Sequence, residues 1–379
     1  MALKSDLLMD VANQIGTPVY VYDKENMINQ VNKLEKAFTD LPAEIHYAMK
    51  ANEHPEILKI FKDKGIGADA VSPNEINRAM QVGFDKSRII YTPSCPSEED
   101  LHQAFKLGIH THIGAIEYLD FVLENYPETA IGLRINPGNS IGGNQKIATA
   151  HNASKFGIPV NQLSQIKNYL NKGLLVDSLH LHTGSDVKTW EDLARSVDVL
   201  FDFAKHFPDL KYLDFGSGFK VKYHPDDVEI NLPAYATYIK QKLDAYNKPV
   251  KIKFEPGKFL VSEAGVLLVK VNVVKKGFDK SFVGVDSGFH HLIRPMYYEA
   301  YHHIVNLSNN VKPSIKYDVV GVLCEEDTFA YDRLLAPVRK DDILMIQNAG
   351  AYGYVMASTY NLRDLPKQVL VEGNSFRQI

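Results

Sequence analysis

The sequence predicts an α/β fold: a TIM-type (β/α)8 barrel followed by a C-terminal antiparallel β-domain. Up to about residue 258, short apolar stretches alternate with amphipathic segments, and this alternation is typical of a barrel of parallel strands. After Lys258 the apolar runs become longer and richer in β-branched residues, which favours a β-sheet. The chain has 379 residues, 45% of them hydrophobic, which suits a barrel with a smaller partner domain.

Eight strands are expected for the barrel, because eight apolar stretches end in a polar or glycine residue before a helix-like segment. In chain order they are "EIHYAMK" to Lys50, "GIGADAVS" to Ser72, "RIIYTPS" to Ser94, "THIGAIE" to Glu117, "AIGLRIN" to Asn136, "LLVDSLHLHTG" to Gly184, "YLDFGSG" to Gly218 and "KIKFEPG" to Gly257. Segments such as "HPEILKIFKDK", "PNEINRAMQVG", "SEEDLHQAFKLG" and "YLDFVLENY" have apolar residues at helical spacing.

The second domain is expected to contain "AGVLLVKVNVVKKG", "SFVGVDSG", "SIKYDVVGVL", "DDILMIQNAG" and "QVLVEG" as strands. The early stretch "TPVYVYD" also resembles a strand but precedes the first barrel strand. We expect it to join the C-terminal sheet. The predicted domains are therefore a barrel over residues 25–258 and a β-domain over residues 259–379, the latter joined by a strand from within residues 1–24.

Composition excludes several classes of function. Forty-two basic and 46 acidic side chains give a net charge of -4 without blocks of like charge, so no nucleic-acid partner is expected. Polar residues interrupt the N-terminal apolar stretch, and no run has the length of a membrane span. We expect a soluble cytoplasmic protein. The two cysteines, Cys95 and Cys324, are too few for a disulfide framework or a cysteine-ligated metal, and each is either a buried small hydrophobe or a reactive thiol.

Polar residues at the expected strand ends point to an active site at the barrel mouth. Reactive side chains of such barrels project from the C-terminal ends of the strands, where this sequence has Lys50, Ser72, Asn136, His182, Gly216 to Gly218 and Glu255. Lys50 is either a loop residue or, with its proton affinity lowered by apolar surroundings and nearby cations, a nucleophile that forms a Schiff base with an aldehyde.

A phosphate site beside such a lysine would indicate pyridoxal phosphate. "LDFGSGFK" places Gly216, Ser217 and Gly218 after the seventh strand, where these barrels often bind phosphate, although a plain tight turn has the same pattern. The next strand ends in "FEPGK", and a carboxylate such as Glu255 can keep a pyridine nitrogen protonated. His182 in "HLHTGS" either stacks on the cofactor ring or is a hydrogen-bonded core histidine beside His180.

The motifs also carry a family resemblance, over residues 15 to 375. "YAMKAN", "SKFG", "HTGSDV", "DFGSGF", "FEPGK", "HLIRPMYYEAYHHI", "GVLCEEDTFAYDR" and "NAGAYGYVMASTYN" resemble, in order and spacing, the fold-type III pyridoxal-phosphate decarboxylases, and among them most closely those that act on diaminopimelate. The resemblance implies an alanine racemase-like architecture and a homodimer with shared active sites. It also implies decarboxylation of meso-2,6-diaminopimelate to L-lysine and carbon dioxide, the last step of lysine biosynthesis, with pyridoxal 5'-phosphate as cofactor and no metal.

Residue roles follow from the same resemblance. Lys50 resembles the Schiff-base lysine, His182 the ring-stacking residue and Glu255 the partner of the pyridine nitrogen. The phosphate-binding elements would be Ser217, Gly218 and the stretch Glu255, Pro256, Gly257 and Lys258, with Tyr352 closing over the cofactor. Arg294, Tyr298 and Glu325 resemble the substrate-binding set, to which Lys258 and Tyr352 also belong. Cys324 resembles the proton donor that one subunit lends to the other.

The chain departs from the family at two positions. Lys258 stands where most members have arginine, and a point charge does not replace a bidentate fork without loss. Ser217 interrupts what is usually a run of three glycines; a serine fits there if its φ is negative, and its hydroxyl adds a donor.

Three other functions remain open on sequence grounds. A related decarboxylase could act on ornithine, arginine or a carboxylated polyamine, but Arg294 and Glu325 favour a substrate that is zwitterionic at both ends. An amino-acid racemase of this fold normally needs a second base and a shorter chain. A catalytically inactive homologue would be expected to lose Lys50 or Cys324, and both are present.

Overall fold

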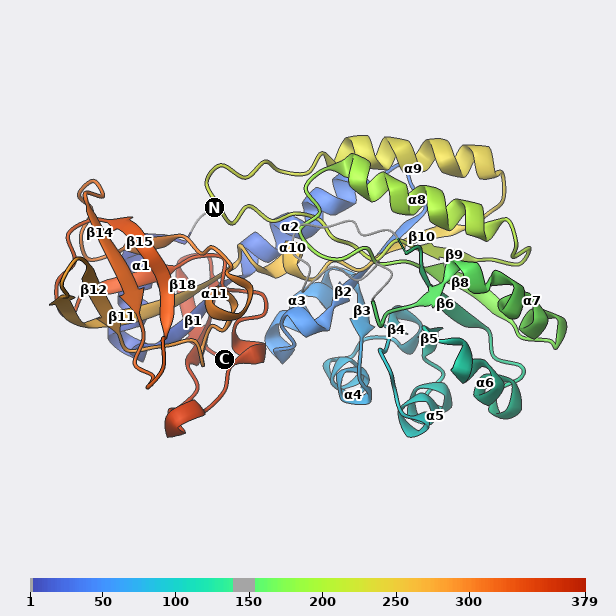
Figure 1. The fold of residues 1–379 in the computed structure, drawn as a ribbon, viewed down its shortest axis with the longest axis horizontal. Helices are drawn as coiled ribbons and strands as arrows, with labels where there is room; N and C mark the ends of the chain where they lie inside the picture. Colours follow the sequence, from blue (N-terminus) through green and yellow to red (C-terminus); the bar gives the residue numbers. More distant parts are fainter. Residues whose placement is uncertain (1–2, 139–153) are drawn as a thin grey trace. The chain divides into compact units, whose positions relative to one another are not determined.

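The computed structural model describes residues 3–138 and 154–379. The chain forms two compact units (Figure 1). One unit, the β-domain, contains residues 1–30, 221–227 and 258–379, and the other, the barrel, contains residues 31–220 and 228–257. The chain therefore starts in the β-domain, builds the barrel and returns to the β-domain.

The barrel is a closed sheet of eight parallel strands, as the sequence predicts. The strand order is β5-β4-β3-β2-β10-β9-β8-β6, and pairing of β5 with β6 closes it. The eight strands are β2 (Ala43–Ala48), β3 (Gly67–Ala70), β4 (Ile89–Tyr91), β5 (His110–Ile113), β6 (Ile131–Asn136), β8 (Val176–His180), β9 (Tyr212–Asp214) and β10 (Lys251–Phe254). Short β7 (Ile158–Pro159) adds to β6 outside this ring. All eight expected strand segments are confirmed.

One helix, α2, precedes the first barrel strand, the other helices follow barrel strands, and they lie outside the strands (Figure 1). They are α2 (Lys24–Ala37), α3 (Pro55–Asp63), α4 (Pro73–Val82), α5 (Glu98–Lys106), α6 (Leu119–Asn125), α7 (Leu163–Asn171), α8 (Trp190–Ala204) and α9 (Leu232–Tyr246). Local signals set their ends: the Ser72 hydroxyl accepts the Glu75 N–H at the start of α4, and Gly83 ends that helix in the left-handed conformation. Helices α8 and α9 lie side by side.

Strand order decides which polar residues meet at the mouth of the barrel. Strands β2, β10, β9 and β8 are consecutive neighbours, with Ile45 of β2 paired to Phe254 of β10 and Leu213 of β9 paired to Leu179 of β8. The segments that follow these four strands therefore emerge next to one another. They contain Lys50, Glu255, the loop 216–218 and His182.

The β-domain is built on a second sheet, in the order β15-β14-β12-β11-β1-β17-β18, with β16 paired to β11 and β13. Its strands are β1 (Val19–Asp23), β11 (Gly265–Lys276), β12 (Ser281–Val285), β13 (Ile304–Asn306), β14 (Ile315–Val320), β15 (Thr328–Leu335), β16 (Ile343–Ile346), β17 (Lys367–Glu372) and β18 (Ser375–Gln378). Strand β1, from the "TPVYVYD" stretch, lies between β11 and β17.

This sheet is mixed rather than purely antiparallel, which corrects one detail of the predicted fold. Strands β1 and β17 are parallel, as are β12 and β14, whereas the other pairs are antiparallel. Parallel neighbours need a long crossover instead of a tight turn. Both parallel pairs have one, because the whole barrel separates β1 from β17, and the short helix α11 (Arg294–Tyr298) with β13 lies between β12 and β14.

The core of the β-domain forms where helix α1 (Ser5–Ile15) packs on this sheet. Leu8, Val11 and Ala12 of the helix are buried against alternate residues of the central strands, namely Val19, Val21, Val266, Leu268, Val369 and Val371. Alternation with period two places these residues on one sheet face. No helix within the described residues is long and apolar enough to cross a bilayer.

Candidate active site

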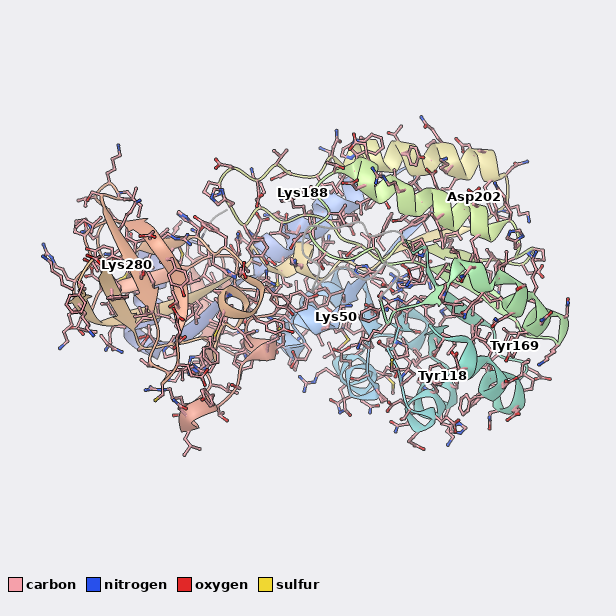
Figure 2. The ribbon with its side chains drawn as sticks, in the orientation of Figure 1. Lys50, Tyr118, Tyr169, Lys188, Asp202 and Lys280 are labelled. Atoms are coloured by element: carbon pink, nitrogen blue, oxygen red, sulfur yellow. The ribbon has the colours of Figure 1, made fainter. Side chains whose placement is uncertain are left out.

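Lys50 lies in a short turn that the neighbouring strand holds in place. Strand β2 ends at Ala48, and the 3-10 turn η1 (Met49–Ala51) carries the lysine beside β2 and α3 (Figure 2). The Ala48 N–H donates to the Pro256 carbonyl (3.3 Å). A Cβ on Gly257 would lie 3.1 Å from the Cβ atoms of Ala48 and Ala51, so the glycine lets the "FEPG" segment pack directly on the turn. The Lys50 side chain is exposed.

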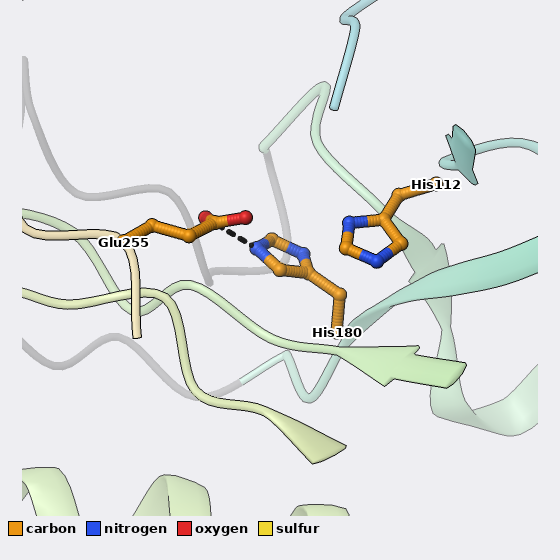
Figure 3. Close-up of side chains that lie close together, drawn as sticks. All are labelled: His112, His180 and Glu255. Atoms are coloured by element: carbon orange, nitrogen blue, oxygen red, sulfur yellow. Dashed lines mark hydrogen bonds and ion pairs between the residues drawn. The ribbon is translucent and has the colours of Figure 1, made fainter. Parts of the chain in front are cut away.

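Glu255 follows β10 and is buried in the barrel (7% exposed). The Nε2 atom of His180 lies 2.9 Å from Oε2 of Glu255, and the two imidazole rings of His112 and His180 stack at 4.9 Å (Figure 3). Burial alone would raise the pKa of Glu255, but its electrostatic interaction and hydrogen bond with His180, with smaller contributions from His112 and Lys50, hold this pKa well below its usual range. Glu255 is therefore an ionised carboxylate at neutral pH.

Two further buried carboxyl groups have the opposite tendency. Burial and the charge of Glu255 raise the pKa values of Asp69 and Asp214 well above the usual range. Electrostatic interactions with Lys50 and Arg134 for Asp69, and with Lys253 for Asp214, act in the opposite direction and lower these pKa values. Because like charges disfavour each other at short range, one carboxylate keeps its charge more readily than three. The interior concentrates that negative charge on Glu255.

The loop after β9 has the geometry of an anion cradle next to His182. Gly216 and Gly218 have φ values of 56° and 125°, and a Cβ would lie 2.6 Å from His182 Nδ1 at the first position and 2.7 Å from the Gly184 oxygen at the second. Ser217 between them does not adopt a positive φ, so a serine is accommodated there. The Ser217 N–H donates to His182 Nδ1 (3.3 Å), and burial, then Lys50, lowers the pKa of His182, which stays neutral.

A second group of predicted residues lies in the β-domain around Tyr223. Arg294, the first residue of α11, is 6% exposed, and its guanidinium lies 5.0 Å from the Tyr223 ring centre and 5.9 Å from that of Tyr298. The Nε atom of Arg294 is buried without a hydrogen-bond partner in the described chain. The amine of Lys258 lies 5.9 Å from the same Tyr223 ring. A buried guanidinium between aromatic rings is suited to an anionic ligand such as a carboxylate.

Cys324 and Glu325 lie in the loop between β14 and β15. Buried Asp327 shapes this loop by accepting the N–H groups of Leu323 (3.1 Å) and Phe289 (2.7 Å). Cys324 accepts a hydrogen bond from the Asn361 amide (3.5 Å), and Glu325 accepts one from the Tyr360 hydroxyl (2.6 Å).

Both cysteines, Cys95 and Cys324, are exposed. The interpretation of either as a buried apolar filler is therefore wrong for this chain.

Tyr352 is half-buried and has a left-handed backbone (φ 54°). Neighbouring Gly350 packs so closely that a Cβ there would collide with the carbonyl of Val261. The "GAYG" loop is therefore fixed on the segment after Lys258.

The structure thus brings Lys50, His182, the 216–218 loop and Glu255 together at the barrel mouth, and Lys258, Arg294 and Tyr298 together around Tyr223 in the β-domain. Sequence reasoning missed four contributors: Tyr223, Asp327, Thr92 and His112. Only Asp327 had a visible signal, its place in the "CEED" motif. The others are single polar residues that become recognisable once the strands are paired.

The ligand-binding chemistry of the barrel fits pyridoxal phosphate: an exposed lysine, an ionised buried carboxylate and a glycine cradle that a Cβ would fill. The pyridoxal-binding domain of the pyridoxal-dependent decarboxylases matches residues 24–262 of the chain.

Full-length relatives show the same similarity. Diaminopimelate decarboxylases from Methanothermobacter thermautotrophicus and Aquifex aeolicus are each 34% identical to the chain; the alignments cover 96% and 98% of it, and 88% and 90% of those proteins. The structure of diaminopimelate decarboxylase from Helicobacter pylori complexed with L-lysine matches with a TM-score of 0.90 and 30% identity, over 98% of this chain and 95% of that one.

Proposed function

Because the chain belongs to the pyridoxal-dependent decarboxylases, and among them to the diaminopimelate decarboxylases, we propose how its own residues carry out that reaction. The reaction is the pyridoxal-phosphate-dependent decarboxylation of meso-2,6-diaminopimelate to L-lysine and carbon dioxide, the last step of lysine biosynthesis. The single observation that carries the assignment of the site is the buried Glu255, which is hydrogen-bonded to His180 and lies next to the Lys50 turn.

The barrel mouth would hold the cofactor through several separate contacts. Lys50 would bind its aldehyde covalently, Glu255 would pair with its ring nitrogen, and His182 would lie against its ring. Ser217, Gly218 and the segment Glu255, Pro256, Gly257 and Lys258 would surround its phosphate, with Tyr352 beside it. When bound, pyridoxal phosphate supplies an electron sink for the electrons that carbon dioxide leaves behind.

Substrate binding is proposed for the β-domain group. Arg294 would bind the distal carboxylate of the substrate, because its buried Nε lacks a partner within the described residues. Glu325 would bind the distal ammonium, and Tyr298, Lys258 and Tyr352 would complete the pocket. A cation and a carboxylate together select a substrate that carries both charges at its far end.

We also propose that the chain works as a homodimer in which Cys324 of one protomer serves the barrel of its partner. The Cys324 thiol would donate its proton to the carbon that has lost carbon dioxide. The exposure of Cys324 supports this assignment, since a proton donor for a partner's site must be accessible on its own chain.

The remaining sequence expectations stay proposals. We assign residues 25–258 to cofactor binding and residues 259–379, with the strand from within residues 1–24, to the β-domain. The cytoplasmic location likewise stays a prediction.

The experiment compares substrates with and without the distal carboxylate. Purified protein with pyridoxal phosphate is incubated in parallel with meso-diaminopimelate, ornithine, arginine and carboxynorspermidine, and released carbon dioxide is measured. We expect release from meso-diaminopimelate well above that from the others. Equal or faster release from ornithine or arginine would overturn the substrate assignment, and racemisation without release would indicate the racemase alternative.

A further inference from the structure

A chain of hydrogen bonds between buried side chains runs through the barrel interior and ends on Glu255. Ser178 Oγ lies 3.3 Å from His112 Nε2, and His112 Nδ1 lies 2.9 Å from Thr92 Oγ1. The Thr92 hydroxyl donates to Oε1 of Glu255 (3.4 Å), and His180 lies 2.9 Å from Oε2. Ser178, His112 and His180 are 0% exposed and Thr92 is 5% exposed, so water does not compete for these bonds.

Only one direction of the protons gives both oxygens of Glu255 a donor. A hydroxyl has one proton, and Thr92 uses it on Oε1. His112 must then donate from Nδ1 to Thr92 and accept from Ser178 at Nε2. Reversal would turn the Thr92 proton to His112 and leave Oε1 without its donor.

His180 provides the second donor in the opposite tautomer. Its Nε2 faces the carboxylate, so the proton is on Nε2, and its Nδ1 is buried without a partner in the part of the chain that the structure describes. Burial lowers the pKa values of both histidines, His112 strongly, which keeps both rings neutral. The two stacked imidazoles are thus assigned opposite tautomers, Nδ1–H for His112 and Nε2–H for His180.

Gly132 leaves the space that the His112 ring occupies in this arrangement. A Cβ at Gly132 of β6, the strand between β5 and β8, would collide with the His112 ring. Any larger residue would displace the ring from its place between Ser178 and Thr92. A glycine is therefore needed at this position to make room for the His112 ring, and not to form a turn.

We propose that His180 and Thr92, the latter oriented by His112 and Ser178, are positioning residues that fix Glu255 as an oriented carboxylate for the ring nitrogen of the cofactor. This inference rests on the proposed function, in which Glu255 contacts that nitrogen. Two donors occupy one lone pair on each oxygen and so hold the carboxylate in one orientation, and the remaining lone pairs would stay available to accept the N–H of the cofactor ring.

A metal centre is the other chemistry that these groups suggest. Ligand atoms of His112, His180 and Glu255 lie within 4.8 Å of one another. However, the rings stack face to face at an interplanar angle of 25° (Figure 3), whereas imidazole ligands bind a metal through lone pairs in the ring plane. Hydrogen bonds also already occupy both nitrogens of His112 and Nε2 of His180.

The first test uses the protein without cofactor. In protein labelled with 15N-histidine, long-range nitrogen–proton spectra report the tautomer of each ring, with assignments from His112→Gln and His180→Gln. We expect Nδ1–H for His112 and Nε2–H for His180 at pH 7. The same tautomer on both rings, or a charged imidazolium on either, would overturn the proposed chain of hydrogen bonds to Glu255. Neither result would bear on whether the enzyme decarboxylates diaminopimelate.

The second test separates the hydrogen bond of His180 from its packing. His180→Phe keeps an aromatic ring in the stack but removes the donor, and the dissociation constant for pyridoxal phosphate should rise about 10- to 100-fold, as expected for one hydrogen bond to a charged group. His180→Gln keeps a donor near the Nε2 position and should recover most of the affinity. Thr92→Val and Thr92→Ser form the equivalent pair.

His46→Leu is the matched control, because it removes another buried imidazole of the same barrel (1% exposed) whose nitrogens have no hydrogen-bond partner among the described residues. It should leave the dissociation constant unchanged. Equal weakening by His180→Phe and His180→Gln, with His46→Leu unaffected, would show that packing alone explains the role of His180 and would overturn the proposal. If the wild-type protein fails to bind pyridoxal phosphate at all, the proposed function fails instead.

Discussion

At the scale of single residues, Lys50 combines exposure with a fixed backbone. The η1 turn is held by the Pro256 carbonyl and by the Tyr47 hydroxyl, which donates to the Asn52 carbonyl (2.9 Å), while the lysine side chain is exposed. A nucleophile is most effective when its backbone is positioned and its amine is accessible.

Lys50 should therefore be the residue that binds the cofactor covalently. Borohydride reduction of the enzyme with pyridoxal phosphate should attach the label to the peptide that contains Lys50, as read by mass spectrometry. Lys50→Ala should take up no label. A label on Lys253 or Lys258 in the wild-type protein would refute this assignment.

Arg294 has a different chemical situation, since its charge is buried beside two aromatic rings. Arg294→Ala should raise the KM for diaminopimelate strongly, because a buried carboxylate that loses its charged partner typically costs about 2 to 5 kcal/mol. Steady-state kinetics at diaminopimelate concentrations below and above KM will measure the change. Arg88→Ala is the control, because it changes an arginine near the surface of the barrel that is paired with Glu44, and it should leave KM unchanged. If Arg294→Ala has the same KM as Arg88→Ala, Arg294 does not belong to the site.

His302 predicts a pH dependence of stability in the β-domain. It is 1% exposed, donates from Nδ1 to the Gln347 carbonyl (2.8 Å), and burial followed by the charge of Arg294 lowers its pKa to about 3. In the unfolded state His302 becomes protonated below about pH 6.5, whereas in the folded state it stays neutral down to about pH 3. The stability that His302 contributes is therefore complete above about pH 6.5 and is lost as pH falls toward about 3.

His302→Asn keeps a donor for Gln347 but cannot titrate. Between pH 7 and 5.5 the wild-type protein should lose about 1 kcal/mol more unfolding free energy than this variant, by the linkage relation for one histidine. Urea unfolding at the two pH values measures the difference. Parallel losses in the two proteins would show that His302 does not carry this effect.

At the scale of elements, the glycine loop after β9 is limited by space as well as by φ. A Cβ on Gly218 would lie 2.7 Å from the Gly184 oxygen, so Gly218→Ala must displace the backbone of the loop. The variant should weaken pyridoxal phosphate binding at least about 10-fold, because that displacement disrupts several hydrogen bonds. Gly108→Ala is a matched control: it has φ 73° but nothing within 4 Å of the added Cβ. It should cost some thermal stability and leave cofactor affinity unchanged; a similar loss of affinity in both would point to backbone strain alone.

The same scale shows why most elements were predictable from the sequence. Apolar stretches and helix signals such as Ser72 with Gly83 are local, and they placed all eight barrel strands and the helices α3 to α6. Strand β15 was missed because its burial alternates irregularly, with Asp332 and Arg333 in its middle. The parallel pairs β1–β17 and β12–β14 were missed because pairing partners far apart in the chain leave no local pattern.

The positions of the proposed site residues in the fold were predictable for the same reason, and their roles stay proposals. Lys50, His182 and Glu255 stand at strand ends, which a strand pattern can locate. The contacts of Glu255 with Thr92 and His180 depend on three different strands that meet in the barrel interior. No spacing along the chain encodes such a meeting, so these contacts required the structure.

At the scale of the whole molecule, the proposed dimer predicts complementation between two inactive variants. Neither Lys50→Ala nor Cys324→Ala homodimers should decarboxylate well, because every site lacks one partner. After mixing and subunit exchange, half of the dimers would be mixed and would each hold one intact site, so about a quarter of wild-type activity should return under two-fold symmetry.

The control for complementation is confirmation of subunit exchange by native mass spectrometry. A mixture that has exchanged its subunits yet remains as inactive as its parents would rule out the shared site. High activity of the Cys324→Ala homodimer alone would remove the thiol from the reaction.

The position of β1 has a consequence for how the chain is made. Strand β1, which is synthesised before the barrel strands, is flanked by β11 and β17 in the folded sheet, and all five of its residues are buried. Every barrel strand is synthesised before either partner, and domains generally acquire structure as they emerge. The barrel can therefore fold on the ribosome while β1 is still unpaired and Val19 and Val21 are exposed. Until β11 and β17 pair with it, β1 is an apolar strand with open edges, which can associate with other chains.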